Sequence, residues 1–311
     1  MTAKVRIILT ALILSAFLAP SWAIAAEPFP TPPATGGPII ADSAVPIAAG
    51  SWSLQPYWKL GFTGGQFSPN WRRVSVGGDF VSLNNQWQIF YGLAPNTEIN
   101  CLVPYNQNWG DRVRDPSLGP GSHAATFGGL GDILLTGKYQ LLEETWYRPV
   151  VTATAKVNFP TGHHLNFNPA KLGLDQLGAG AYAFTLGFDL AKYLPALNLK
   201  LYGNLWYALS ATDTLNRTRV HNRDQVTVNL AAEYPLSRRW VALMEIYQQW
   251  EGGTLLGPRS HLPPVALLGF LPGIEYLLSP KWNFELGVSI DLAGKNTAFK
   301  YTPIFTMIYN F

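Results

Sequence analysis

Ionisable side chains recur at alternate positions within apolar segments of this sequence. Side chains of these types at this spacing are candidates for a functional role. They are Lys59, Glu98, Asp132, Lys138, Lys156, Asp189, Lys200, Glu233, Glu245, Glu275, Glu285 and Asp291. In a membrane protein such groups are costly unless they face water or one another, so they are candidates for lining a passage. Both signs of charge occur, which disfavours a ring of one charge that would select ions strongly. A closed interior filled by ion pairs is the alternative interpretation.

The histidines offer little support for metal or hydrolytic chemistry. All of them fall in segments expected to be outer loops, namely His123, His163, His164, His221 and His261. Adjacent histidines rarely converge on one metal ion without further ligands, so we expect solvated loops, no metal and no cofactor. A lipase would need a nucleophilic Ser beside a His on the barrel wall, and no His lies on a predicted strand. We expect no enzyme, although a protease built from loop residues such as Asp224 and His221 stays open.

Strands must position these charged groups. In residues 151–159 the odd positions are apolar, whereas the even positions are Thr, Lys or Asn. In residues 282–292 the even positions are mostly large and apolar, whereas Glu285 and Asp291 occupy odd positions. This alternation is the period of a β-strand, because a helical pattern would place Lys156 and Glu285 inside the apolar stripe. A soluble β-sandwich also alternates, so periodicity alone does not decide the fold.

The connections between the strands favour a membrane barrel. The predicted strands are 52–63, 84–93, 98–106, 130–142, 150–160, 178–190, 197–210, 225–236, 239–251, 265–278, 282–293 and 299–311. Longer polar loops are predicted at 64–83, 107–129, 161–177, 211–224 and 252–264, and short turns alternate with them. This arrangement predicts an all-β, transmembrane, antiparallel up-and-down β-barrel of about 12 strands. A barrel of that size is compatible with a narrow pore or a plugged scaffold.

The last segment, residues 300–311, ends the chain on aromatic residues. Tyr309 and Phe311 share one face with other apolar side chains, while Asn310 lies on the other. The segment resembles the closing strand of bacterial outer-membrane β-barrels, in which a terminal aromatic residue is a recognition signal. Tyr309 and Phe311 are therefore the predicted assembly signal, and the barrel-assembly machinery is the predicted partner.

The start of the chain has the features of an exported protein. Lys4 and Arg6 precede an apolar run, and a small-residue pattern at 23–25 follows it. These features predict a signal peptide over residues 1–26, cleaved after Ala25 or Ala26. Residues 27–50 are rich in Pro and Gly, and a mobile periplasmic tail is favoured over a strip entering the lumen. The barrel is then expected to span residues 51–311.

Composition agrees with this class of protein. There are 22 Lys+Arg against 19 Asp+Glu, and Lys4 and Arg6 leave with the signal peptide, so the mature charge is about +1 and nucleic acid is not an expected partner. The single cysteine, Cys101, excludes an internal disulfide framework. Trp52, Trp240 and Trp282 each open a predicted strand at the same end of the barrel, as expected of an aromatic girdle at the membrane boundary.

A further resemblance lies between Gly128 and Leu190. The run Gly128-Gly129-Leu130-Gly131-Asp132 leads into a strand containing Lys138-Tyr139, and after a turn a second strand ends in Pro160-Thr161-Gly162. This order resembles a family of outer-membrane β-barrels taken to be transporters of the meta-pathway of phenol degradation. The resemblance implies an outer-membrane channel that passes small molecules, including aromatic or hydrophobic compounds. A structural or adhesive barrel without transport is the alternative, and an outer-membrane hydrolase is a weaker one.

Arginines crowd the predicted outer loops. They are Arg72, Arg73, Arg112, Arg114, Arg217, Arg219, Arg223 and Arg259. The guanidinium fork suits the phosphates of lipopolysaccharide, so outer-membrane lipid and lipopolysaccharide are predicted partners. Ordinary solvation of loop charges is an equal alternative.

Overall fold

The computed structural model describes residues 29–114, 116–215, 218–221, 224–256 and 260–311. The predicted signal peptide, residues 1–26, and its cleavage positions lie outside the described residues. Among the described residues, no helix is long and apolar enough to cross a bilayer. The helices in this part of the chain are short 3-10 turns, η1 (Pro116–Leu118), η2 (Pro169–Lys171) and η3 (Pro195–Leu197).

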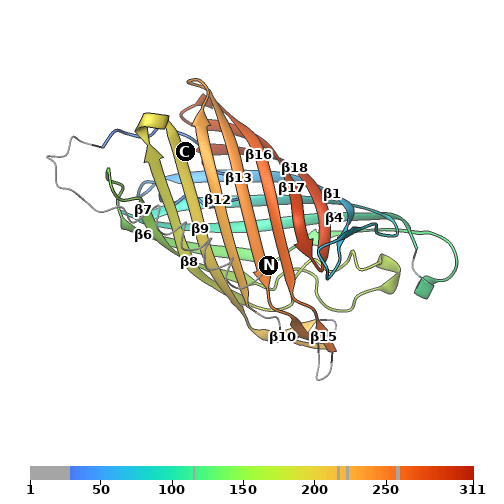
Figure 1. Cartoon of the computed structure of the whole chain (residues 1–311). Helices are drawn as coiled ribbons and strands as arrows, with labels where there is room; N and C mark the ends of the chain where they lie inside the picture. Colours follow the sequence, from blue (N-terminus) through green and yellow to red (C-terminus); the bar gives the residue numbers. More distant parts are fainter. Residues whose placement is uncertain (1–28, 115, 216–217, 222–223, 257–259) are drawn as a thin grey trace.

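Within the described residues, twelve long antiparallel strands close into a barrel (Figure 1). They are β1 (Trp52–Phe67), β3 (Asp79–Ala94), β4 (Thr97–Val113), β6 (Ile133–Leu142), β7 (Val150–Phe159), β8 (Ala183–Leu194), β9 (Leu199–Ser210), β12 (Gln225–Pro235), β13 (Trp240–Glu251), β16 (Val265–Ser279), β17 (Trp282–Lys295) and β18 (Thr297–Asn310). Each pairs with its neighbour in chain order, and β18 pairs with β1. The predicted fold class and strand number are confirmed.

The two ends of the barrel differ. The C terminus and the β8–β9 turn lie at one end, which we call the turn end, and β10 and β15 lie at the opposite end, the loop end (Figure 1). Further strands belong to the loop end: β2 (Arg73–Val74), β5 (His123–Leu130), β10 (Thr212–Leu215), β11 (Thr218–His221), β14 (Thr254–Leu256) and β15 (Ser260–Leu262). The predicted loops 211–224 and 252–264 thus contain a four-stranded sheet, in which backbone groups beyond the membrane pair with one another.

Some predicted strand boundaries were wrong. β1 continues to Phe67, β3 begins at Asp79 and β4 continues to Val113, so these strands reach well into the predicted loops. The sixth predicted strand was placed too early, because β8 runs from Ala183 to Leu194 rather than over 178–190. Pairing with β9 continues as far as Leu194 opposite Leu199, and only the 3-10 turn beginning at Pro195 ends it.

The alternation predicted along the strands sorts side chains between the lumen and the outer face. In β17 the Leu286 side chain is 55% exposed on the outside, whereas its neighbour Glu285 is 1% exposed. Met244 and Leu186 are also exposed apolar residues on outward positions. In water such a surface would be unfavourable, but a bilayer favours it, so the outer face is lipid-facing.

Aromatic pairs mark the turn end of that face. Three tryptophans at strand starts each pack against a tyrosine on the paired strand. The ring centroids are 4.3 Å apart for Trp52 and Tyr91, 4.6 Å for Trp240 and Tyr276, and 4.4 Å for Trp282 and Tyr309. Amphipathic rings favour the membrane–water boundary, so this girdle fixes the height of the barrel in the bilayer.

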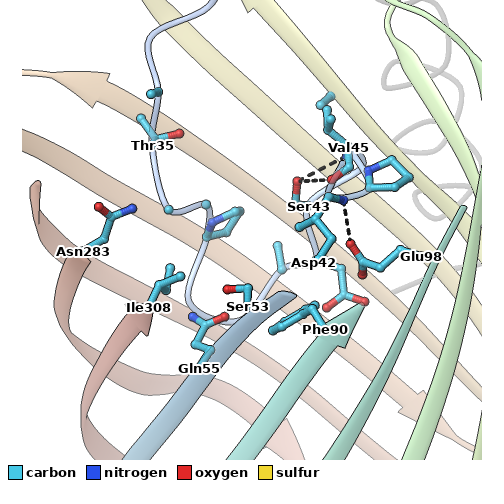
Figure 2. Close-up of a pocket in the computed structure, with 18 of the residues that line it drawn as sticks. Thr35, Asp42, Ser43, Val45, Ser53, Gln55, Phe90, Glu98, Asn283 and Ile308 are labelled. Carbon is cyan, nitrogen blue, oxygen red and sulfur yellow. Dashed lines mark hydrogen bonds between the residues drawn. The ribbon is translucent and has the colours of Figure 1, made fainter. Parts of the chain in front are cut away.

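The favoured interpretation of the N-terminal segment was wrong. Residues 29–50 do not form a tail outside the barrel; they enter the lumen and contact its wall (Figure 2). We call residues 29–50 the plug segment. The physical reason is that an irregular backbone needs hydrogen-bond partners, and the inward polar side chains of the barrel supply them.

Candidate functional site

The lumen is the candidate functional site, and the plug segment organises its residues. Figure 2 shows the segment passing between Glu98 and Phe90 on one side and Asn283 and Ile308 on the other. The cross-strand register places most of the predicted ionisable side chains on inward positions. For example, Glu98 lies opposite Lys138, and Glu275 lies opposite Glu285.

Glu245 of β13 holds the deepest part of the plug segment. Its two carboxylate oxygens accept hydrogen bonds from the backbone N–H groups of Ile39 at 2.6 Å, Ile40 at 3.0 Å and Ala41 at 2.8 Å. A buried carboxylate without donors would be very unfavourable, and these N–H groups compensate it. The sequence predicted that Glu245 lines a passage. In the structure Glu245 instead anchors the segment that occupies this passage.

A narrow point lies where Gly36 passes Glu275 and Glu285. The Gly36 N–H donates to Glu275 Oε1 at 2.5 Å. A Cβ atom at this glycine would lie 2.6 Å from Glu285 Oε1 and 2.7 Å from Glu275 Oε1, so no larger residue fits without movement. Both carboxylate oxygens of Glu285 are buried and have no hydrogen-bond partner among the described residues.

Glu233 of β12 continues this acidic wall towards the turn end. Its Oε2 accepts hydrogen bonds from the Thr35 hydroxyl at 2.6 Å and from the Tyr202 hydroxyl at 2.8 Å. Lys200 lies opposite Glu233 in the β9–β12 register and packs over the Tyr202 ring, 5.0 Å from its centroid. One side of the lumen therefore presents clustered carboxylates to the plug segment.

The opposite wall is basic and holds Asp42 of the plug segment. Lys156 Nζ lies 2.9 Å from Asp42 Oδ2, and Lys138 Nζ lies 3.6 Å from the same atom. Lys138 Nζ also lies 3.9 Å from the Asp189 carboxylate. Burial alone would raise the pKa of Asp42, but the ammonium groups of Lys138 and Lys156 outweigh this effect and lower the pKa to about 2. The plug segment thus bridges walls of opposite charge.

Further hydrogen bonds complete the attachment on this side. Asp42 and Asn204 exchange two bonds of 3.0 Å, from the Asp42 N–H to Asn204 Oδ1 and from Asn204 Nδ2 to the Asp42 carbonyl. Lys138 Nζ donates to the Ser43 carbonyl at 3.0 Å, and Ile47 N–H donates to Glu98 Oε2 at 3.0 Å (Figure 2). Together these bonds fix the course of the segment through residues 42–47.

Apolar contacts fill the space between the two charged walls. Ile39 packs against inward-facing residues of the barrel: Tyr57, Val241, Leu243, Leu271 and Ile304. A second cluster joins Ala41 and Ala44 of the plug segment to Val150, Ala191, Tyr202 and Ala231. Burying this surface stabilises the segment inside the barrel. It also narrows the lumen at mid-height.

A cavity lies on each side of this constriction. The larger, about 560 Å³, lies at the turn end between the plug segment and wall residues that include Gln55, Glu98 and Asn283. The second, about 350 Å³, lies at the loop end and is lined by residues that include Phe80, Asn108 and Lys300. The interior therefore has an opening towards each end, and residues 36–44 lie between them.

Two other predicted residues, Lys59 and Asp291, have distinct surroundings. Lys59 Nζ lies 4.8 Å from the centroid of the Tyr57 ring. Asp291 accepts hydrogen bonds from the Tyr247 hydroxyl at 3.0 Å and from the Lys300 N–H at 2.8 Å. Lys59 and Asp291 therefore line the lumen wall, and among the described residues neither forms a hydrogen bond or ion pair with the plug segment.

Asp132 has a different position, at the loop end. Its carboxylate accepts hydrogen bonds from Asn158 Nδ2 at 3.1 Å, the Gly162 N–H at 2.9 Å and the Ala179 N–H at 2.8 Å. Thr161 Oγ1 donates to the Gly131 carbonyl at 2.9 Å. The Gly-Asp and Pro-Thr-Gly motifs therefore meet in one junction that holds residues 160–182.

Sequence reasoning missed Asp42 and Trp206. Trp206 faces the lumen, where Lys156 Nζ lies 3.3 Å from its ring centroid and its Nε1 donates to Asp189 at 2.9 Å. Its even position in β9 is the one signal that could have identified it. Asp42 could have been noticed as the one carboxylate in residues 29–50.

The histidines of the loop end do not converge. His163 Nδ1 lies 2.6 Å from the Asp175 carbonyl, and His164 Nδ1 lies 2.7 Å from the Gly162 carbonyl. Across the described part of the chain, no group of three or more His, Cys, Asp or Glu is placed to hold a metal ion. His221 and His261 belong to β11 and β15, and nothing is described of their side chains.

The loop arginines are described in part. Arg112 forms an ion pair with Asp79, and Arg73 stacks on the Phe299 ring at 3.3 Å from its centroid. Arg217, Arg223 and Arg259 lie outside the described residues, and the Arg219 side chain is also not described.

Comparison with known proteins gives a family and a fold. Residues 99–305 match the profile of a family described as "Putative MetA-pathway of phenol degradation". A comparison with curated proteins found no match. The chain resembles the crystal structure of an outer membrane channel from Pseudomonas putida F1 with a TM-score of 0.70 and 15% identity, covering 86% of this chain and 98% of that one.

Other outer-membrane barrels are more distant. The toluene transporter TbuX of Ralstonia pickettii aligns with a TM-score of 0.45 and 8% identity, over 88% of this chain and 92% of that one. The translocator domain of the autotransporter NalP from Neisseria meningitidis aligns with a TM-score of 0.45 and 13% identity, over 85% and 90%. The match to the Pseudomonas putida channel establishes a shared barrel fold.

Proposed function

The chain belongs to the family described as "Putative MetA-pathway of phenol degradation", and from this premise we propose that it passes small molecules, including aromatic or hydrophobic compounds, across the bacterial outer membrane. The observation that carries the proposal is the pair of cavities at opposite ends of the lumen, separated by residues 36–44 of the plug segment. A purely structural barrel has no need of cavities on both sides of a constriction.

Passage through this lumen requires the plug segment to move. Its anchors are hydrogen bonds to Glu245 and Glu275 and ion pairs from Asp42, all of which are reversible. Each such bond contributes roughly 1–3 kcal/mol, so a partial shift of the segment is accessible while complete removal is costly. The proposed passage is therefore narrow and gated by the segment.

Lipid contact follows from the apolar outer face, and we propose two further partners. The aromatic C-terminus at Tyr309 and Phe311 would be read by the barrel-assembly machinery. Loop-end arginines such as Arg72 and Arg114 would dock lipopolysaccharide phosphates through their guanidinium groups. Arg112 contributes less to such docking, because Asp79 already pairs with it.

The test uses the mature protein in planar bilayers and in cells. We expect small conductance steps for the wild type and larger ones for a variant that lacks residues 29–43. Cells without the protein should take up labelled phenol or toluene more slowly than the parent strain. No conductance in either protein and no uptake defect would instead favour a structural or adhesive barrel.

A further inference from the structure

The cavity at the loop end has an apolar side. Phe80 of β3 lies in it, and Leu174 from residues 160–182 covers it. Both side chains pack over Gly110, since a Cβ atom there would lie 3.3 Å from Leu174 Cδ1 and 3.4 Å from Phe80 Cε1. Asn108 Nδ2 donates to the Leu174 carbonyl at 3.0 Å, which fixes this cover. An aromatic face and an aliphatic cover favour a flat apolar ligand.

The same cavity has a polar side on the neighbouring strands. Thr63 of β1 lies opposite Phe80 of β3 and opposite Lys300 of β18, so the three residues form one row across three strands. Among the described residues, no hydrogen bond or ion pair engages the side chains of Thr63, Ser82 or Lys300. Adjacent strands are about 4.8 Å apart, so the backbones carrying the aromatic ring and the ammonium group are about 10 Å apart.

We infer that the loop-end cavity is a binding site for a monoaromatic compound bearing a carboxylate or hydroxyl group. The ring rests against Phe80 and Leu174, and the oxygen substituent reaches Thr63, Ser82 and Lys300. The volume of about 350 Å³ is at the lower end of the range of ligand pockets, about 300–1,000 Å³, as a one-ring compound requires. The inference rests on the proposed function, because it names the solute class that the passage would receive.

Alternative ligands fit this arrangement less well. An inorganic anion would use Lys300 and the hydroxyls but would leave the surface of Phe80 and Leu174 uncovered. An unsubstituted hydrocarbon would use the apolar side but would make no contact with the polar groups of Thr63, Ser82 and Lys300. A ring with an oxygen substituent contacts both sides together.

The experiment measures binding of benzoate and phenol to the mature protein in lipid nanodiscs, with empty nanodiscs subtracted. Lys300→Gln should weaken benzoate binding about tenfold, because a charge-assisted hydrogen bond is lost, and should change phenol binding little. Phe80→Leu, which keeps apolar volume but removes the ring, should weaken both roughly two- to tenfold.

Two matched variants provide the controls. Lys281→Gln removes the same charge from an exposed turn at the turn end, and Phe188→Leu makes the same ring deletion on the lipid-facing surface. Both should bind as the wild type does. Folding of every variant is checked by heat-modifiable gel mobility.

The possible results separate the site from transport. No saturable benzoate binding, or equal binding in wild type, Lys300→Gln and Phe80→Leu, would overturn the site. Uptake of labelled benzoate by cells is measured in parallel. Normal uptake in both variants would overturn the site but leave the proposed function, whereas binding that depends on Lys300 and Phe80 without any uptake would leave the site and contradict transport.

Discussion

Lys156 on β7 and Asp42 on the plug segment form an ion pair with 2.9 Å between Nζ and Oδ2, so one wall charge fixes the segment across the lumen. Asp42→Asn should loosen this attachment, because Lys156 and Lys138 then lose their shared counter-charge. We expect more frequent or larger conductance steps in planar bilayers. Asp111→Asn, the same change at an exposed site, is the control, and equal conductance in both variants would contradict the anchoring role.

The pH dependence of this ion pair can be predicted from the pKa of Asp42. Its ordinary value of 3.8 is lowered to about 2 in the folded protein. A lowered folded pKa means that the stabilisation is fully present above pH 4 and is lost as the pH falls towards 2. The difference in conductance between the wild type and Asp42→Asn should therefore be constant between pH 7 and pH 4 and disappear only below that. Loss of this difference already at pH 5 would contradict the assignment to Asp42.

Gly36 should tolerate no side chain while the plug segment stays in place. In Gly36→Ala the new methyl group would meet the carboxylates of Glu275 and Glu285, so we expect the segment to shift and the conductance to rise. Gly77→Ala is the matched control, since no atom lies within 4 Å of a Cβ at that position. Unchanged conductance in Gly36→Ala would show that the side chains of Glu275 and Glu285 move instead of the plug segment.

The two faces of β17 should respond differently to charge. Leu286→Arg places a charge on the lipid-facing surface, which costs about 2–4 kcal/mol near the bilayer midplane. Ser289→Arg points into the lumen and loses one hydrogen bond, to the Tyr247 hydroxyl, worth about 1 kcal/mol. Unfolding in urea from liposomes measures both. Equal destabilisation would mean that the assignment of faces is wrong.

The C-terminal aromatic residue should matter for assembly more than for packing. Phe311 is 67% exposed, and its contacts are the Tyr309 ring at 4.7 Å and a 3.0 Å hydrogen bond from its N–H to the Trp52 carbonyl. Deletion of Phe311 should sharply reduce the yield of folded protein in the outer membrane, whereas Asn310→Ala should be mild. Similar yields would argue against a recognition signal.

The barrel could be predicted from the sequence because strand alternation is local. Lys156 and Glu285 were assigned to the inner face from their immediate neighbours, and the register agrees. Strand ends were less predictable, since pairing between β8 and β9 continues to Leu194 opposite Leu199, beyond the predicted end at Leu190. Where a strand ends depends on the strand with which it pairs, and that partner lies outside any short window of the sequence.

The plug segment was beyond such reasoning for a different reason. Residues 29–50 have no periodicity, and their position is decided by partners distant in the chain, such as Glu245 for Ile39 and Glu275 for Gly36. Their Pro and Gly content correctly indicated irregular backbone. It could not indicate that the barrel interior would satisfy that backbone.

The two ends of the plug segment lie at the same end of the barrel. The Phe29 ring packs 5.3 Å from Trp146 and 6.3 Å from Tyr193, while the Gly50 N–H donates to the Gly92 carbonyl at 2.7 Å. The segment is therefore an excursion that enters and leaves by one opening, without passing through the barrel. Topologically it is unlinked from the closed ring of strands. The segment can be inserted after β18 has paired with β1. It can also be withdrawn and reinserted without breaking the pairing of any two strands.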